Sequence, residues 1–157
     1  LIAFTGGNKT VTSLLIKGNY PPVRRLFPET VDNYAVVNTA DLIEATNRVG
    51  LVLEREAALR FSFREGSVTL EAAGSETAQA SETIDAHLAG EETTVSLKPQ
   101  FLLDGLRSTH SEFARIAFTR TDNPSKPGPV LITSQRSKDE ASDESFRYLL
   151  QPNLLLR

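Results

Sequence analysis

Cysteine is missing from all 157 residues of the chain. Its absence excludes disulfide bonds, thiolate metal sites and cysteine nucleophiles, and it fits a reducing cytosol. No apolar run approaches the roughly 18 residues that span a bilayer, and no signal-like segment opens the chain. We therefore expect a cytoplasmic protein.

A basic excess is also missing, because the formal net charge is −3. Proteins that bind nucleic acid tightly through direct contacts usually carry a clear excess of Lys and Arg. Any contact of this chain with DNA is therefore expected to be local, weak or topological.

The motifs of common enzyme sites are absent as well. There is no glycine-rich phosphate loop, no G-x-S-x-G elbow and no H-E-x-x-H pair. His87 and His110 have no nucleophile beside them, which favours a surface or capping role for each. The paired carboxylates fall in expected turns or polar loops, where solvation is expected: Glu91 with Glu92, Asp139 with Glu140, and Asp143 with Glu144. An acidic-site hydrolase or a Mg²⁺ site would need two of them to converge in a cleft, so we expect neither an enzyme nor a cofactor.

Length and composition indicate one full domain plus a fragment. Hydrophobic residues make up 39% of the chain, enough for a core, and charged residues 24%, as on an ordinary surface. The chain has no initiator methionine and opens on LIAF, which is typical of the middle of a strand. We expect it to be the C-terminal portion of a longer protein.

Hydrophobic periodicity predicts the same order of elements twice. After strands at 1–4 and 10–16, the first set is a strand at 31–38, a helix at 40–55 capped by Thr39, and strands at 59–64, 68–72 and 81–88. The second set is a strand at 93–97, a helix from Pro99 to Arg107, and strands at 113–119, 130–134 and 146–151, with loops at 122–128 and 135–145. A repeat of about 60 residues, with two amphipathic helices on antiparallel sheets, predicts an α+β domain.

Residues 20–28 read YPPVRRLFP and form a stiff connector. Two adjacent prolines fix φ and remove two backbone donors, so a sheet cannot continue through them. The apolar side chains of Val23, Leu26 and Phe27 can anchor one short turn, which ends at Pro28. This pattern fits a boundary between two domains, and it also fits a proline-bounded loop.

The connector, together with YLLQP at 148–152, resembles the bacterial DNA polymerase III beta subunit, the sliding clamp. The resemblance covers nearly the whole chain, with residues 1–28 as the tail of the middle domain and 29–157 as the last domain. It implies the DNA-clamp fold, with helices lining a central hole and sheets facing outward. It also implies a replication processivity factor in the bacterial cytoplasm, associated with the nucleoid, whose homodimeric ring encircles duplex DNA and tethers the replicative polymerase.

The resemblance assigns three sets of residues. A pocket for short linear peptides of polymerases, the clamp loader and repair proteins takes Pro21, Arg25, Leu26, Pro129, Val130, Leu149, Leu150, Gln151, Pro152 and Asn153. The DNA-facing candidates on the polar faces of the helices are Arg48, Lys98 and Arg107, for which ordinary solvated charges are an equal alternative. The contact between subunits takes Val52 and Leu53, with Leu51 beside them.

The chain departs from the family at Gln151, where methionine is usual, and in its last five residues, NLLLR. A glutamine narrows and polarises the pocket wall relative to a flexible thioether. We therefore expect weaker peptide binding and an altered inhibitor preference, as in a divergent copy of this antibiotic target. Without a first domain the fragment is expected to be monomeric. A stand-alone peptide-binding adaptor unrelated to replication remains the alternative interpretation.

Overall fold

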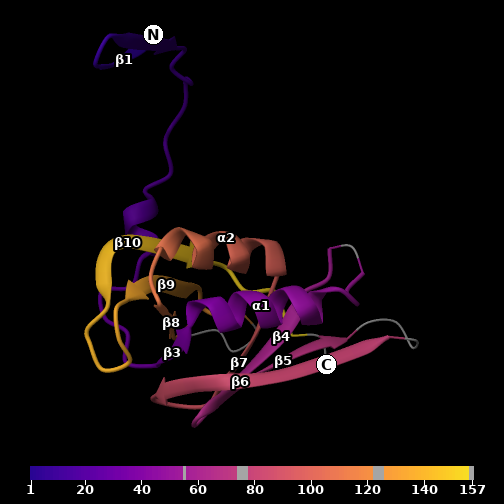
Figure 1. The fold of residues 1–157 in the computed structure, drawn as a ribbon. Coiled ribbons are helices and arrows are strands. Elements are labelled where there is room, and N and C mark those ends of the chain that lie inside the picture. The colour runs from indigo at the N-terminus through magenta and orange to yellow at the C-terminus, as the bar shows by residue number, and fades with distance from the viewer. Residues whose placement is uncertain (55, 74–77, 122–125, 156–157) are drawn as a thin grey trace.

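The computed structural model describes residues 1–54, 56–73, 78–121 and 126–155. Within these residues, two helices lie side by side on one face of an antiparallel sheet, and a separate two-stranded hairpin projects from the domain (Figure 1). The elements in chain order are β1 (Ile2–Gly6), β2 (Lys9–Ser13), η1 (Val23–Leu26), β3 (Tyr34–Asn38), α1 (Thr39–Gly50), β4 (Leu59–Arg64), β5 (Ser67–Ala73), β6 (Gln79–Ala89), β7 (Thr93–Leu97), α2 (Pro99–Thr109), β8 (Phe113–Phe118), β9 (Val130–Gln135) and β10 (Asp143–Leu150).

The large sheet has the strand order β10-β9-β8-β3-β6-β5-β4-β7. The predicted α+β class and the repeated order of a strand, a helix and three strands are confirmed. The first strand of each repeat pairs with a strand of the other repeat: β3 pairs with β8, and β7 pairs with β4. Beyond β10, the N–H of Asn153 donates to the carbonyl of Ser96 at 2.8 Å, so the C-terminal segment meets the far edge strand β7.

The core lies between the helices and the sheet. In β4 every second residue is buried, with Leu59, Phe61 and Phe63 inward and Arg60 and Arg64 exposed. This is the alternation that a half-buried strand requires, and the predicted hairpin of β4 and β5 pairs along its length. The helices add Leu42, Ala45 and Val49 from α1 and Leu102 and Leu106 from α2.

The first helix differs from its prediction at both ends. Its N-cap is Asn38 rather than Thr39, because the Asn38 side chain accepts a hydrogen bond from the Asp41 N–H at 3.1 Å. The helix ends at Gly50 rather than at residue 55, and the chain turns there, with the N–H of Leu53 bonded to the Gly50 carbonyl at 3.1 Å. The predicted end, Arg55, lies outside the described residues.

Most other boundaries also move, by one to three residues. β2 ends at Ser13, where its partner β1 runs out, and β3 begins at Tyr34, where its pairing with β6 and β8 begins. β10 begins at Asp143, so Asp143 and Glu144 lie in a strand and not in the predicted loop. The last helix starts at Pro99 as predicted and runs to Thr109. Part of the predicted loop at 122–128 and the final two residues lie outside the described part of the chain.

Candidate functional site

The C-terminal wall of the expected pocket is built by pairing of β9 and β10. Leu150 lies opposite Val130, and Leu149 lies opposite Leu131. Leu150 and Val130 are buried in the core, whereas Leu149 is only half-buried because strand neighbours face opposite ways. Pro152 is buried beyond the end of the strand, and Asn153 is held by Ser96. The structure therefore brings six of the ten expected pocket residues into one region: Pro129, Val130, Leu149, Leu150, Gln151 and Pro152.

The segment that precedes β9 is fixed from both sides. The side-chain amide of Gln151 donates to the carbonyl of Pro127 at 2.8 Å. On the opposite side, the hydroxyl of Thr119 donates to the carbonyl of Pro129 at 2.7 Å. Sequence reasoning assigned Gln151 to this wall but missed Thr119 and Pro127.

The connector reaches β10 through a contact between Phe27 and Arg147 that was not predicted from the sequence. The guanidinium carbon of Arg147 lies 4.8 Å from the centre of the Phe27 ring, a distance typical of a cation–π contact. Figure 1 shows η1, which ends one residue before Phe27, beside β10. Pro21 and Arg25 are exposed, and Leu26 is 61% exposed. The connector is thus attached to the domain at Phe27 while its other expected pocket residues face solvent.

Two of the three expected DNA-facing cations are already engaged by carboxylates. Arg48 lies 2.6 Å from Glu82 and 3.3 Å from Glu44. The hydrogen bond with Glu82, and to a smaller extent that with Glu44, raises the pKa of Arg48. Lys98 lies 2.6 Å from Glu56, and this bond lowers the pKa of Glu56. Lys98 is the residue that caps α2 rather than part of a helix face, which corrects its expected placement.

Arg107 is exposed in the last turn of α2, as expected. It lines a shallow hollow of about 480 Å³ where the start of α1 meets the end of α2. His110, which lines the same hollow, is the left-handed C-cap of α2 with φ of 49°, in agreement with its predicted capping role.

The expected subunit contact divides into one exposed and two anchored residues. Leu51 is 84% exposed, whereas Val52 and Leu53 pack against the core.

Beside α1 runs β6, which contacts the helix through the bond between Arg48 and Glu82. β3 pairs only with the last four residues of β6, so within the described part of the chain no strand covers that edge of β6 from Gln79 to Asp85. This edge could not be predicted from the sequence, because pairing between distant strands leaves no local signal.

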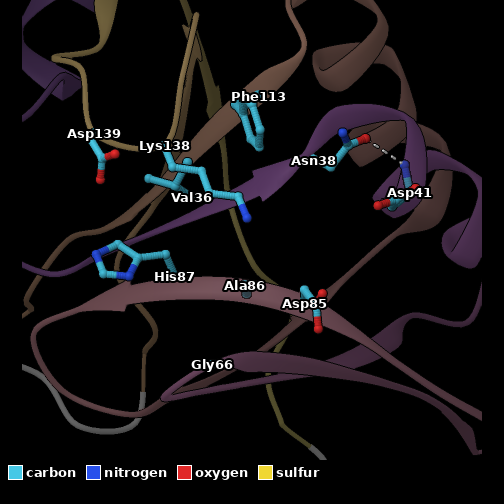
Figure 2. A pocket seen from close by; sticks show the side chains of 10 residues that line it. All are labelled: Val36, Asn38, Asp41, Gly66, Asp85, Ala86, His87, Phe113, Lys138 and Asp139. Carbon is cyan, nitrogen blue, oxygen red and sulfur yellow. Dashed lines mark hydrogen bonds between the residues drawn. The ribbon is translucent and has the colours of Figure 1, made fainter.

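A further hollow of about 450 Å³ contains none of the expected site residues (Figure 2). Its floor includes Val36 and Phe113, and its rim carries Asp85, His87 and Lys138. Figure 2 shows Lys138 extending over the hollow from the segment that precedes β10. The rim mixes charges of both signs and defines no single ligand chemistry.

Among the described residues, no group of three or more His, Cys, Asp or Glu side chains could hold a metal ion. Among the same residues, no helix has the length and apolar character needed to cross a bilayer.

Residues 24–146 match the family model described as "DNA polymerase III beta subunit, C-terminal domain". The chain is 38% identical over 152 residues to the beta sliding clamp of Streptomyces coelicolor, covering 97% of this chain and 39% of that protein. It is 34% identical over 152 residues to the "Beta sliding clamp homolog GriR" of Streptomyces muensis, with coverages of 97% and 39%. The chain therefore spans well under half the length of these relatives.

Solved structures agree with the fold. A sliding clamp of Bartonella birtlesii, solved bound to griselimycin, superposes with a TM-score of 0.80 at 22% identity, covering 98% of this chain and 38% of that one. The beta chain from Streptococcus pneumoniae gives 0.79 at 24% identity, with coverages of 98% and 39%. The clamp-domain fold is shown by these matches, and the family is one of clamps rather than enzymes. Because the family model spans most of the chain, this protein belongs to the family of the bacterial DNA polymerase III beta subunit, the sliding clamp, and its residues 24–146 correspond to the C-terminal domain of that family.

Proposed function

We propose that this chain is the C-terminal part of a sliding-clamp subunit, which in full-length form tethers the replicative polymerase to duplex DNA and binds short peptide motifs of replication and repair proteins. The observation that carries the proposal is the contact of Phe27 with Arg147, because it joins the connector to the strand that leads into Leu149 and Pro152. Those are the two segments that the family resemblance assigns to one peptide groove.

The chemistry of these residues suits an extended apolar peptide. Leu26 exposes most of its side chain and Leu149 part of it, so both can contact a ligand without a rearrangement of the core. Pro21 and Pro152 restrict the backbone on the two sides. A groove that is rigid before binding loses less conformational entropy when a peptide enters, which favours affinity.

The test is fluorescence anisotropy with a labelled consensus clamp-binding pentapeptide. We expect saturable binding to the chain and a loss of about ten-fold or more in affinity for Leu26→Ala, as for a groove anchor. Leu51→Ala is the matched control, because Leu51 is also an exposed leucine but lies at the end of α1. Absence of peptide binding would overturn the proposal and favour an adaptor unrelated to replication. Equal affinities for Leu26→Ala and the unmodified chain would exclude the connector from the groove.

We further propose that residues 1–28 are the tail of a middle domain and residues 29–157 the last domain. Residues 1–22 are all exposed, and β1 and β2 pair with each other. The hairpin and the segment after it leave large apolar side chains uncovered, among them Phe4, Val11, Leu14 and Ile16. An apolar surface of this kind is expected to be covered by the remainder of a domain.

Ring closure is proposed to use Leu51, Val52 and Leu53 together with the uncovered edge of β6. An uncovered edge offers backbone donors and acceptors to a strand of another chain. Leu51 supplies an exposed apolar side chain three residues after Arg48, which bonds Glu82 on β6. In the family such a contact also requires a first domain, whereas the match of this chain is to the C-terminal domain. We expect sedimentation to show a monomer, and a stable dimer of this chain would contradict the assignment.

Contact with DNA is proposed to be topological, with Arg107 as the available cation and with Arg48 and Lys98 shared with carboxylates. An encircling ring does not need a large salt-sensitive contact network to stay on DNA. The isolated chain is expected to bind duplex DNA weakly in a filter or anisotropy assay. Tight binding at physiological salt would contradict a topological mode.

We also propose a bacterial cytoplasmic location associated with the nucleoid, together with an altered response to inhibitors. Clamps of Pseudomonas aeruginosa and Bartonella birtlesii have been solved bound to griselimycin, and the chain is related to GriR. Competition of griselimycin with the labelled pentapeptide would test whether the groove accepts this compound. Tight competition would argue against an inhibitor-tolerant copy.

A further inference from the structure

The two prolines in the segment 127–129 interrupt the sheet where β9 begins. In the ladder order, β9 lies between β8 and β10, with Phe118 and Leu150 both opposite Val130. One step earlier in the chain, Pro129 and Pro127 have no N–H to donate to either neighbour. Their half-buried carbonyls can still accept hydrogen bonds from donors on either side.

Two side chains supply those donors. Nε2 of Gln151 donates to the Pro127 carbonyl at 2.8 Å from the side of β10. From the side of β8, the hydroxyl of Thr119 donates to the Pro129 carbonyl at 2.7 Å, and the Thr119 N–H reaches the same oxygen at 3.3 Å. The position of this segment therefore depends on the Gln151 amide on one side and on the Thr119 hydroxyl and N–H on the other.

Gly128 shows how closely this segment is held against Thr119. A Cβ atom at Gly128 would lie 2.3 Å from the Thr119 carbonyl oxygen and 2.5 Å from its hydroxyl oxygen. No side chain larger than hydrogen fits there without moving the backbone. The segment is thus seated against β8 and is tied across to Gln151 on the other side.

We propose that Gln151 and Thr119 are positioning residues that fix Pro127–Gly128–Pro129 between β8 and the C-terminal strand and so set the width of the peptide groove. The inference rests on the proposed function, because it makes this segment one wall of the proposed groove. A wall tied to Gln151 narrows the groove and favours a smaller anchor side chain. Releasing the tie lets the wall move outward and admits a larger one.

The test compares two labelled pentapeptides that differ only in whether one anchor residue is leucine or phenylalanine. Gln151→Met and Gln151→Glu both remove the donor, and each is expected to shift the affinity ratio toward phenylalanine by about 3- to 10-fold, the range expected for one net hydrogen bond. Gln151→Lys keeps an N–H donor of similar reach and is expected to retain the original ratio. Thr119→Val is expected to shift the ratio in the same direction as Gln151→Met, and Thr119→Ser to retain it.

Using a ratio separates positioning from general destabilisation, because loss of fold weakens both peptides alike. An unchanged ratio in Gln151→Met, Gln151→Glu and Thr119→Val would overturn the inference. So would an equal shift in Gln151→Lys, since that variant retains the donor.

A second measurement keeps the inference separate from the proposed function. Exchange of the amide hydrogen of residue 119 reports whether the segment is seated, because this N–H donates to Pro129. Faster exchange in Gln151→Met but not in Gln151→Lys is expected even if neither peptide binds. Failure of both peptides to bind would overturn the proposed function and the groove-width role with it. Unchanged exchange in Gln151→Met would overturn the tie itself.

Discussion

Arg48 on α1 makes two hydrogen bonds with Glu82 on β6, at 2.6 Å from Nη2 and 3.0 Å from Nε. This pair joins the first helix to the strand whose edge is uncovered. The bond with Arg48 holds the pKa of Glu82 below its ordinary value. An arginine that was expected to face DNA is therefore also a link within the domain.

The first prediction concerns the pKa of Glu82. In Arg48→Gln it is expected to rise toward the ordinary glutamate value of about 4.3, as measured by NMR titration of the side-chain carboxyl carbon. A carboxyl whose pKa is lowered by folding stabilises the protein above its unfolded pKa, and this contribution is lost as the pH falls through the folded pKa. The stability difference between Arg48→Gln and the unmodified chain should therefore be largest near neutral pH and should shrink below pH 4.

The matched control is Lys98→Gln, which removes the partner of Glu56. It should raise the pKa of Glu56 and leave that of Glu82 unchanged. The stability changes are expected to be small, because both ion pairs are largely exposed to solvent. A pKa of Glu82 that does not move in Arg48→Gln would show that the pair does not persist in solution.

A second prediction follows from the close approach of Gly105 on α2 to Tyr148 on β10. A Cβ atom at Gly105 would lie 2.7 Å from Cδ1 of Tyr148 and 3.1 Å from Cδ1 of Ile132. Gly105→Ala is expected to lower the free energy of unfolding by about 1–3 kcal/mol, the usual cost of overpacking. Urea unfolding followed by circular dichroism measures this change.

Gly50→Ala is the control for that experiment, because no atom lies within 4 Å of the position of its Cβ. It lies at the end of α1, so alanine is expected to leave stability unchanged or to raise it by up to about 1 kcal/mol. Equal effects of the two substitutions would show that α2 can move away from β10 at little cost.

A third prediction concerns Gln135, whose side chain is fully buried. Its oxygen accepts from Nε of Arg115 at 2.8 Å, and its amide donates to the carbonyls of Ser137 at 2.6 Å and Lys138 at 3.1 Å. Gln135→Leu keeps the volume but removes these three part-buried hydrogen bonds, so a loss of about 3 kcal/mol is expected, at about 1 kcal/mol for each bond. Thermal or urea unfolding measures it.

For comparison, Gln100→Leu removes an exposed glutamine that bonds Asp104 on the same helix at 2.9 Å. A change within about 0.5 kcal/mol is expected there. If Gln135→Leu were equally mild, the segment that follows β9 would have other attachments that replace those of Gln135.

The order of elements could be predicted from the sequence because local patterns of residues indicate each element. The alternation that begins at Leu59 and the proline at the start of α2 identify their elements without any tertiary information. The end of α1 was not accessible, since Val52 and Leu53 continue the apolar stripe of the helix although they pack from the turn after it. The hydrophobic pattern indicates which residues are buried. It does not indicate whether a buried residue belongs to the helix or to the turn that follows it.

The candidate site was accessible only in part for a related reason. The strand residues around Leu150 could be assigned from family resemblance, but the residues that connect the walls could not. Phe27 and Arg147 lie at opposite ends of the chain, and the bond from Gln151 to Pro127 depends on strand order. Such contacts carry no periodic signal, so they become visible only once the sheet is assembled.

A fourth prediction tests where the domain begins. Residues 1–20 are all exposed, so removing them is expected to change the free energy of unfolding by no more than about 0.5 kcal/mol. Removing residues 1–28 also deletes Phe27, and the lost contact with Arg147 is expected to cost about 0.5–2 kcal/mol. Urea unfolding of the three chain lengths measures both steps.

Phe27→Leu in the full chain separates the aromatic contact from the loss of chain. It keeps an apolar side chain but removes the ring over which Arg147 lies, and it should reproduce most of the loss caused by removing residues 1–28. If the shorter truncation were already strongly destabilising, the hairpin would pack on the domain in solution. If both truncations were neutral, the connector would not be anchored at Phe27, and the groove proposed between it and the C-terminal strand would lose its fixed wall.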